Sequence, residues 1–371
     1  MLELRVGGGM MQPIGKKSIK FVQLKGNHRE IGRQMGEACE GEVRHSIETA
    51  RSLVEALSTE LKIDWEMATI QAQKYSPYIR EYYPQYLDEL SGIAEGSQCS
   101  FADILTLNAL EGIVMDRLHL GKCTSLAINQ RMARKRNVLV AHNEDWFPDD
   151  EDDVYMIKAE VEDEPPFLAM NYGGLLPNIG FNKAGIAQCC DTVYPKEKRI
   201  GIPRAVVGRA VLGAKTIGEA IQRAISPHRA AGYNHLVAHE SGELYNVEVS
   251  ARNFAILYGE KGYLAHANHY LSAKMQSIEE EPEDLVGSHV RYNRALRMIK
   301  EKEDHDIASL QEIQRDHVNF PYSICCHATH LANPYEREKT ICALVMDLNE
   351  KVIYLAWGNP CQNLYYPFCL E

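Results

Sequence analysis

The cysteine in the stretch Lys122-Cys123-Thr124-Ser125 offers the most distinctive chemistry in this sequence. If the peptide bond between Lys122 and Cys123 is cleaved, Cys123 becomes an N-terminal residue with a thiol and a free α-amine. The unperturbed pKa of such an amine is about 7.7–8.0, so it can accept the thiol proton near neutral pH. The resulting thiolate is a nucleophile for a carbonyl carbon. A cysteine taken alone is more often a buried structural thiol, so the hypothesis depends on the residues around it.

A carboxylate is predicted to lie at the same end of a strand pair as Cys123. Two strand-like runs, 124–128 and 138–142, are joined by a polar segment, which indicates a hairpin. In an antiparallel pair, the residue numbers of two facing residues always add up to the same total. A loop centre near Arg134 therefore puts Cys123 opposite about Asp145. We therefore expect the Asp145 carboxylate close to Cys123. The alternative is that Asp145 only caps the loop that follows it.

Cysteine and histidine residues near the C-terminus raise an alternative in which the chain binds a metal ion. The candidates are close in sequence: Cys325, Cys326, His327 and His330. Adjacent cysteines rarely ligate one zinc ion, and the two histidines lack a cysteine pair at zinc-finger spacing. We therefore expect no metal site and no cofactor, and metal binding remains an alternative function.

The first third of the chain must position these groups, and its pattern is helical. Across residues 28–57 apolar residues recur at three- and four-residue steps, with a shift of phase after Met35, which favours two successive helices with one buried face. Gly32 and Gly36 share one face, which indicates close packing against a neighbouring element. Further helical patterns follow at 65–78, 86–95 and 101–118.

After residue 121 the pattern changes from helices to strands and hairpins. Turn signals such as Gly173-Gly174 and residues 182–185 separate short apolar runs. Two pairs of helices interrupt the strands, at 204–213 and 217–226 and at 287–302 and 307–317. This order predicts antiparallel sheets packed between helical layers, an α+β fold rather than a doubly wound parallel one.

Composition and charge exclude several classes of function. The formal net charge of −11 argues against general nucleic-acid binding, which requires clustered Lys and Arg. No apolar run approaches the roughly 18 residues of a membrane span, and no signal-peptide pattern opens the chain. The ten cysteines have no disulfide-framework spacing, so we expect free thiols and a cytoplasmic protein. The acidic clusters at 149–153 and 279–284 are predicted to be solvated loops.

Several short motifs occur together in a fixed order along the chain. Besides residues 122–125 they are Asn143-Glu144-Asp145-Trp146, residues 180–185 (Gly-Phe-Asn-Lys-Ala-Gly), residues 266–269 (His-Ala-Asn-His) and the helical opening 29–36. In this order they resemble the acyl-coenzyme A:6-aminopenicillanic acid acyltransferase family. That family belongs to the N-terminal nucleophile (Ntn) hydrolases and is related to choloylglycine hydrolases and acid ceramidase. The similarity covers nearly the whole chain.

The resemblance implies a precursor that cleaves itself between Lys122 and Cys123. Fragments 1–122 and 123–371 would stay associated as one four-layer αββα domain with a helical N-terminal segment. The mature enzyme would be an amidohydrolase or N-acyltransferase that forms a thioester on Cys123. Its partners would be a small-molecule amide or acyl thioester, with no nucleic acid and no membrane. Substrate identity, the balance of hydrolysis and transfer, and oligomeric state do not follow from the sequence.

The resemblance also implies roles for individual residues. Asn268 is the candidate oxyanion donor, because a side-chain amide can stabilise the developing negative charge. Asp145 would orient the new α-amine of Cys123. Arg291 would support the nucleophile, and Arg294, one helical turn further on, is the alternative.

The sequence departs from the family pattern at two places, and the first of them, Lys122, supports a rival interpretation. The family commonly has glycine before the nucleophile, whereas Lys122 stands here, and glycine tolerates a strained peptide that lysine does not. Where relatives tend to carry Asn, this chain has Cys189-Cys190-Asp191, to which no catalytic role is assigned. The rival is an unprocessed, non-catalytic scaffold that keeps the fold.

Overall fold

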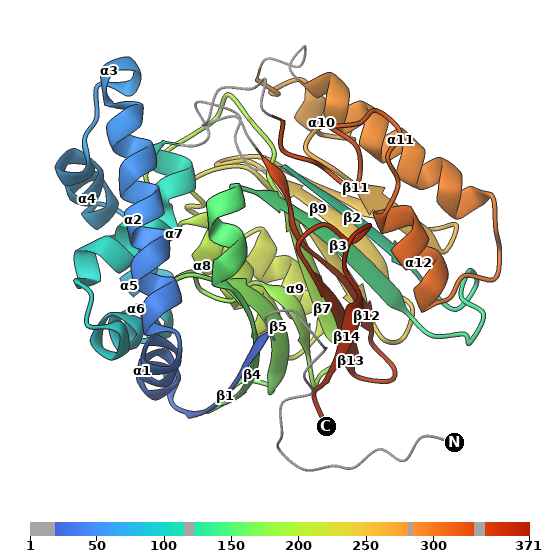
Figure 1. The fold of residues 1–371 in the computed structure, drawn as a ribbon, viewed down its shortest axis with the longest axis horizontal. Helices are drawn as coiled ribbons and strands as arrows, with labels where there is room; N and C mark the ends of the chain where they lie inside the picture. Colours follow the sequence, from blue (N-terminus) through green and yellow to red (C-terminus); the bar gives the residue numbers. More distant parts are fainter. Residues whose placement is uncertain (1–18, 115–121, 281–284, 330–337) are drawn as a thin grey trace.

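Two β-sheets lie face to face in the computed structural model, which describes residues 19–114, 122–280, 285–329 and 338–371. Helices cover the outer face of each sheet (Figure 1). The layers therefore run helix, sheet, sheet, helix. This confirms the predicted α+β fold and the αββα order that the resemblance to Ntn hydrolases implied.

The helical N-terminal segment begins with one strand. Its elements are β1 (Lys20–Gly26), α1 (His28–Ala38), α2 (Glu40–Ala56), α3 (Ser58–Leu61), α4 (Trp65–Gln73), α5 (Ser76–Tyr82), α6 (Pro84–Ser97) and α7 (Phe101–Ile113). Asn27 caps α1, because its side chain accepts the Glu30 N–H and the Glu30 carboxylate accepts the Asn27 N–H. The helix pair predicted across 28–57 is confirmed.

Helices α1 and α6 pack backbone to backbone through glycine. A Cβ added to Gly32 would lie 2.1 Å from the Glu89 carbonyl oxygen, and one added to Gly36 would lie 2.4 Å from the Ile93 carbonyl oxygen. On the facing helix, a Cβ on Gly92 would lie 2.1 Å from the Arg29 carbonyl oxygen. The close packing predicted for the first two glycines is confirmed.

The first sheet contains β1 and seven strands from the second part of the chain. In spatial order they are β1, β4 (Val154–Val161), β5 (Phe167–Tyr172), β6 (Ile179–Asn182), β7 (Ile186–Asp191), β8 (Tyr233–His239), β9 (Leu244–Val249) and β10 (Phe254–Tyr258). Strand β1 pairs in parallel with β4, and the other neighbours are antiparallel. The sequence did not predict β4.

The second sheet carries the predicted hairpin at its centre. In spatial order its strands are β11 (Tyr263–His266), β2 (Lys122–Ile128), β3 (Leu139–Trp146), β12 (Lys339–Asp347), β13 (Val352–Trp357) and β14 (Tyr365–Cys369). Side-chain hydrogen bonds join the sheets, among them Ser125 Oγ to Asp191 Oδ1 (2.7 Å) and Asn246 Nδ2 to the Ala265 oxygen (3.1 Å). Strand β2 therefore lies with one face against the first sheet.

The remaining helices complete the outer layers. Helices α8 (Arg204–Leu212) and α9 (Ile217–Ala224) cover the first sheet beside the N-terminal helices, and α11 (Val286–Lys300) and α12 (Ile307–Gln314) cover the second (Figure 1). The short α10 (Ala273–Gln276) lies near β10.

The acidic run 149–153 is not the solvated loop that the sequence predicted. It lies within a 3-10 helix, η2 (Pro148–Asp153), in which Asp150 and Asp153 are buried. The Asp153 carboxylate contacts His45 Nδ1 of α2 at 2.9 Å. These two carboxylates are buried because the run turns under α2 on its way into the buried strand β4. Of the second acidic cluster, Glu279 is buried, and residues 281–284 lie outside the described ranges.

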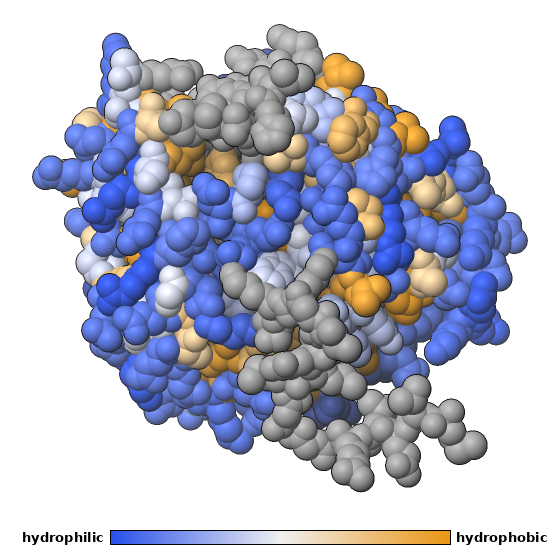
Figure 2. All heavy atoms as spheres, viewed as in Figure 1, coloured by the Kyte–Doolittle hydropathy of each residue, from blue (hydrophilic) through white to orange (hydrophobic). Residues whose placement is uncertain are grey.

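Among the described residues, no helix is long and apolar enough to cross a membrane. The face in Figure 2 is mostly hydrophilic, and its apolar side chains form small separate groups.

Candidate active site

Cys123 is the second residue of β2 and is only 4% exposed. Its Cα partner across the hairpin is Glu144, and Asp145 faces Lys122. The predicted register was therefore wrong by one residue, because the true centre of the hairpin lies half a residue earlier than assumed. Asp145 still lies at the Cys123 end of the strand pair, as expected.

Three of the predicted site residues are in direct contact. The Cys123 N–H donates to Asn268 Oδ1 at 3.1 Å. The Arg291 guanidinium donates to the Cys123 carbonyl oxygen, to Thr124 Oγ1 (2.9 Å) and to Asn268 Oδ1 (2.7 Å). Arg291 thus holds the Cys123 backbone and the amide of Asn268 together. Arg294, the alternative, points away and binds Asp316 Oδ2 at 2.7 Å.

Asn268 follows β11, and both its side-chain oxygen and its side-chain nitrogen are engaged in hydrogen bonds. Its Oδ1 accepts the two hydrogen bonds just described, and its Nδ2 donates to the Thr192 oxygen at 3.0 Å. An oxyanion role for Asn268 would require Nδ2 to exchange the Thr192 oxygen for the substrate. That role stays a prediction.

Asp145 is a fully buried carboxylate, and one of its two oxygens accepts no hydrogen bond from the described residues. Thr340 Oγ1 donates to its Oδ1 at 2.6 Å, whereas Oδ2 has no hydrogen-bond partner among the described residues. Burial raises the Asp145 pKa to about 7, although Arg291 and the Thr340 hydroxyl both act to lower it. The free oxygen is a place where a new cation would be stabilised.

The sequence did not predict that Glu144 would be the carboxylate closest to the thiol. Cys123 Sγ lies 3.5 Å from Glu144 Oε2, which is also 2.7 Å from His142 Nε2. The Tyr172 hydroxyl donates to the other oxygen, Glu144 Oε1, at 3.0 Å. The motif 143–146 contained the signal for this contact, but the one-residue error in register pointed to its neighbour.

Burial and charge keep the Cys123 thiol protonated in the uncleaved chain. Its pKa lies well above the usual range because of burial first, and then because of the carboxylates of Glu144, Asp191 and Asp145. Burial alone would lower the His142 pKa, but hydrogen bonds with Cys189 and Glu144 raise it well above the usual value. The Cys123 thiol and the His142 imidazole both contact Glu144 Oε2, so this carboxylate oxygen lies between them.

The cluster continues into the first sheet through Asp191. Ser125 Oγ contacts both His142 Nδ1 (2.8 Å) and Asp191 Oδ1 (2.7 Å), and Asn234 Nδ2 donates to Asp191 Oδ2 at 3.0 Å. Asp191 therefore belongs to a buried polar chain that leads from Cys123 across the two sheets. It is not among the residues that line the pocket described next.

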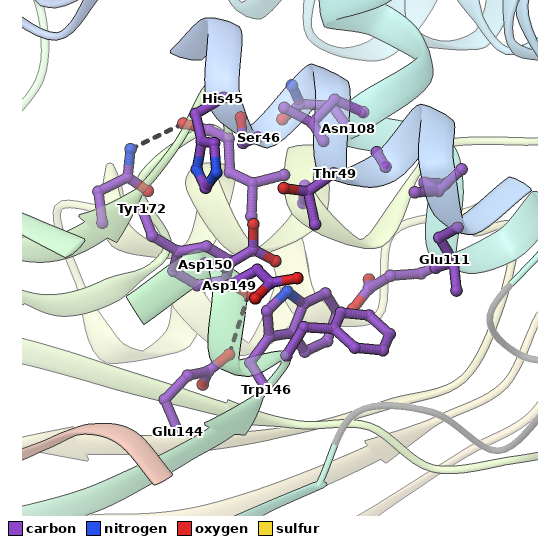
Figure 3. A pocket seen from close by; sticks show the side chains of 18 of the residues that line it. His45, Ser46, Thr49, Asn108, Glu111, Glu144, Trp146, Asp149, Asp150 and Tyr172 are labelled. Atoms are coloured by element: carbon purple, nitrogen blue, oxygen red, sulfur yellow. Dashed lines mark hydrogen bonds between the residues drawn. The ribbon is translucent and has the colours of Figure 1, made fainter. Parts of the chain in front are cut away.

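A pocket of about 440 Å³ opens beside Glu144. Glu144 of β3 lies across it from His45 of α2 (Figure 3). Five carboxylates line it, Glu48, Glu111, Glu144, Asp149 and Asp150, as do the aromatic side chains of Trp146, Phe147, Tyr172 and Tyr233. Its lining, taken from the described residues, includes no Lys or Arg.

The carboxylates of this pocket are only partly compensated. Arg204, which lies outside the lining, contacts Glu111 Oε2 through its Nε at 2.7 Å. His45, which lines the pocket, is paired with Asp153 rather than with a carboxylate of the lining. Burial, together with the neighbouring Asp153, raises the Asp150 pKa to about 7. An excess of negative charge therefore remains at Glu48 and Asp149, and Asp150 adds to it only as the pH rises through about 7.

The spacing of the thiol cluster would also suit a metal ion. The donor atoms of Cys123, His142 and Glu144 all lie within 4.8 Å of one another. Because the Cys123 thiol and the His142 imidazole both hydrogen-bond to Glu144, that spacing is accounted for without an ion.

Comparison with known proteins places the chain in a family. A family model described as acyl-coenzyme A:6-aminopenicillanic acid acyl-transferase matches residues 132–362, more than half of the 371 residues. The chain belongs to this family. The matched segment contains Asp145, Asn268 and Arg291, and it begins after Cys123.

Two curated relatives match most of the chain. The acyl-coenzyme A:6-aminopenicillanic-acid-acyltransferase 40 kDa form of Emericella nidulans is 23% identical over 310 residues, which are 82% of this chain and 84% of that protein. The β-alanyl-dopamine/carcinine hydrolase of Drosophila melanogaster is 20% identical over 380 residues, or 94% of this chain and 95% of that protein. One of these relatives is named as an acyltransferase and the other as a hydrolase.

Solved structures of a hydrolase and of an acylase also match. The conjugated bile acid hydrolase of Clostridium perfringens has a TM-score of 0.45 and 13% identity, and the match covers 67% of this chain and 97% of that one. The penicillin V acylase of Agrobacterium tumefaciens has a TM-score of 0.43 and 15% identity, and the match covers 63% and 83%.

Proposed function

We propose that this chain is a self-processing cysteine amidohydrolase or acyltransferase that acts on amides carrying a cationic amine. The observation that carries the proposal is the Cys123 thiol, held against Glu144 where Glu144 also lines a carboxylate-rich pocket. Family membership supports acyl chemistry, and the pocket supports the class of substrate.

Self-cleavage would begin with Glu144 accepting the thiol proton. Cys123 Sγ then attacks the Lys122 carbonyl carbon, the bond to the Cys123 nitrogen breaks, and that nitrogen takes up the proton. Water hydrolyses the resulting thioester, which leaves a carboxylate on Lys122 and restores the thiol. Asn268 and Arg291 hold the Cys123 N–H and carbonyl oxygen on either side of the thiol.

Lys122 is compatible with this step despite the glycine common in the family. It is paired within β2 and is not among the described residues with positive φ, so its backbone needs no glycine. Its ammonium group binds Glu338 Oε2 at 2.7 Å and lies over the Tyr322 ring. These contacts anchor the residue whose carbonyl is attacked.

After cleavage the new α-amine would act as the base for turnover. The free oxygen of Asp145, which faces Lys122 in the strand pair, would stabilise its ammonium form. The Cys123 thiolate attacks the substrate carbonyl, the amine leaves, and water or an acceptor amine takes the acyl group from the thioester. Fragment 1–122 would stay bound because β1 is a strand of the same sheet as β4 to β10.

The charge of the pocket favours a substrate that carries a primary amine. Glu48 and Asp149 attract a cation, and the surrounding aromatic rings can hold an ammonium group as well. β-Alanyl amides, the class in the name of the Drosophila relative, carry such an amine. The carboxylate of 6-aminopenicillanic acid would instead be repelled.

The first test is the intact mass of the denatured protein. We expect fragments 1–122 and 123–371, with Cys123 at the new N-terminus. The Cys123→Ala variant should remain whole, whereas Cys369→Ala, an exposed thiol in β14, should cleave normally. A wild-type chain that stays whole after long incubation would reject the proposal in favour of the non-catalytic scaffold.

The second test compares β-alanyl amides with their N-acetylated, neutral counterparts. Because one favourable charge interaction is worth on the order of 1 kcal/mol, we expect kcat/KM to be at least about fivefold higher for the free amine. Equal values for the two substrates would reject the cationic class while leaving self-cleavage untouched. Added acceptor amines, with product analysis, separate transfer from hydrolysis.

A further inference from the structure

Four metal-ligand side chains converge at a place away from Cys123. The donor atoms of His317, Cys325, His327 and Cys361 all lie within 4.8 Å of one another. His317 follows α12, Cys325 and His327 lie in the segment between α12 and β12, and Cys361 lies between β13 and β14. We propose that these side chains bind one zinc ion, as a Cys2His2 site.

The distances are those of a tetrahedral zinc site. His327 Nε2 lies 3.1 Å from His317 Nε2, 3.4 Å from Cys325 Sγ and 3.5 Å from Cys361 Sγ. Zinc bonds of about 2.3 Å to sulfur and 2.0–2.1 Å to nitrogen give tetrahedral edges of about 3.3 Å between nitrogens and about 3.5 Å between nitrogen and sulfur. One ion at the centre matches all three distances.

Hydrogen bonding alone does not explain this convergence. A neutral imidazole nitrogen carries either one proton or one lone pair, so His327 Nε2 can satisfy one of its three close neighbours. A zinc ion, by contrast, accepts one lone pair from each of the four side chains. Asn359 Nδ2 lies 3.5 Å from Cys325 Sγ and 2.7 Å from the Cys326 oxygen, a contact of the kind that orients a ligating thiolate.

The site would be structural rather than catalytic. Four protein ligands complete the coordination of zinc and leave no position for water or substrate. The ion would tie the segment after α12 to the loop before β14. Cys326, between two of the ligands, donates its N–H to Thr340 Oγ1 at 2.9 Å, and Thr340 donates to Asp145. The ion would therefore hold in place a segment that supports Asp145.

The direct test is the metal content of the wild-type protein, purified with a thiol reductant and without chelator. We expect about one zinc per chain. Exchange for cobalt(II) should give the visible bands of a tetrahedral ion and the ultraviolet charge-transfer bands of thiolate ligation. These spectra are read on the folded wild-type chain, so the test does not depend on the stability of any variant.

Matched variants locate the ion. Cys361→Ser should weaken cobalt binding at least about tenfold and reduce the thiolate band, whereas Cys369→Ser, another exposed cysteine, should bind like wild type. Cys123→Ala removes the thiol of the other candidate cluster, Cys123, His142 and Glu144. It should also keep the full cobalt spectrum, because the cobalt ion binds at the other four side chains.

Three results would overturn the proposal. The reduced wild-type chain could fail to bind zinc or cobalt at micromolar concentrations. The cobalt spectrum could be lost in Cys123→Ala and kept in Cys361→Ser, which would put the ion beside Glu144. Thiol mapping without reductant could instead find a disulfide between Cys325 and Cys361 in the metal-free protein and no uptake of metal after its reduction.

Discussion

At the residue scale, Arg291 is the side chain that joins the most parts of the candidate site. Its guanidinium donates to the Cys123 carbonyl oxygen, Thr124 Oγ1 and Asn268 Oδ1. Lysine keeps the charge but loses the planar fork that reaches three acceptors at once. We expect Arg291→Lys to slow self-cleavage by roughly 10- to 100-fold, measured as the loss of full-length chain on denaturing gels.

Arg294→Lys provides the matched control for this prediction. Arg294 lies on the same helix, but among the described residues its guanidinium donates to Asp316 and not to Cys123. It should cleave at close to the wild-type rate. Equal slowing in both variants would mean that Arg291 acts only through the stability of α11.

A buried carboxyl group of the pocket should make stability depend on pH. Burial, helped by Asp153, raises the Asp150 pKa to about 7, well above its ordinary value of 3.8. Between about pH 4 and pH 7 the folded chain therefore binds more protons here than the unfolded chain, and raising the pH lowers the free energy of unfolding. Asp150→Asn removes this loss.

The measurement is urea unfolding at pH 4.5 and pH 7.5, in chains that also carry Cys123→Ala so that they stay whole. Relative to Asp150→Asn, the chain with Asp150 should lose roughly 2–4 kcal/mol between the two pH values. Asp149→Asn, the exposed neighbour, should change with pH as its parent does. If Asp150→Asn and its parent lose the same stability with rising pH, Asp150 does not carry the shifted pKa.

Much of the candidate cluster around Cys123 could be predicted from residue types and order. The motif positions led to Cys123, Asn268 and Arg291, and the structure brings these three into contact. Glu144 was missed because a side chain changes face with every residue of a strand, so a small error in the loop centre selects the wrong neighbour. Loop geometry, which sets that centre, is weakly encoded in a polar run.

At the element scale, the contact between α1 and α6 leaves no room for a side chain. We predict that Gly32→Ala lowers the free energy of unfolding by about 2–3 kcal/mol, since its Cβ would lie 2.1 Å from the Glu89 carbonyl oxygen and force the helices apart. Urea denaturation of the Cys123→Ala chain measures the change.

Gly41→Ala, in α2, is the control for helix propensity. A Cβ there would meet nothing within 4 Å, so the change should raise the free energy of unfolding by a few tenths to about 1 kcal/mol. If Gly32→Ala were as harmless as Gly41→Ala, the close approach of the two helices would be wrong.

Helices and strands with a strong periodic pattern of apolar residues could be predicted from the sequence. Segments that are buried only through contacts with distant parts of the chain could not. The helix pair in 28–57 and the hairpin around Arg134 follow from local patterns. Strand β4 begins directly after an acidic run, and its strand pattern was masked by that run. The acidic run itself predicts a surface loop, but Asp150 and Asp153 are buried. Their burial depends on α2, which lies more than 90 residues earlier in the chain.

At the scale of the whole molecule, sites assembled from distant segments could not be read from spacing. The sequence offers Cys325, Cys326, His327 and His330 as candidate metal ligands because they are close together along the chain. In the structure Cys325 and His327 instead meet His317 and Cys361, the Cys326 thiol lies 3.6 Å from the Glu338 oxygen, and His330 lies outside the described ranges. The acidic pocket likewise joins α2 and α7 to β3 and η2. Such groupings exist only once the layers have packed.

The parallel pairing of β1 with β4 sets a constraint on how the chain acquires its structure during synthesis. Lys20 pairs with Tyr155 and Gly26 with Val161, so the first strand cannot be bonded until residues far beyond the Lys122–Cys123 peptide have left the ribosome. Helices α1 to α7 are therefore synthesised while β1 beside them still lacks its partner strand β4. If the chain is later cut, that strand sits on a separate polypeptide. Refolding from the denatured state then becomes a bimolecular reaction whose rate depends on protein concentration.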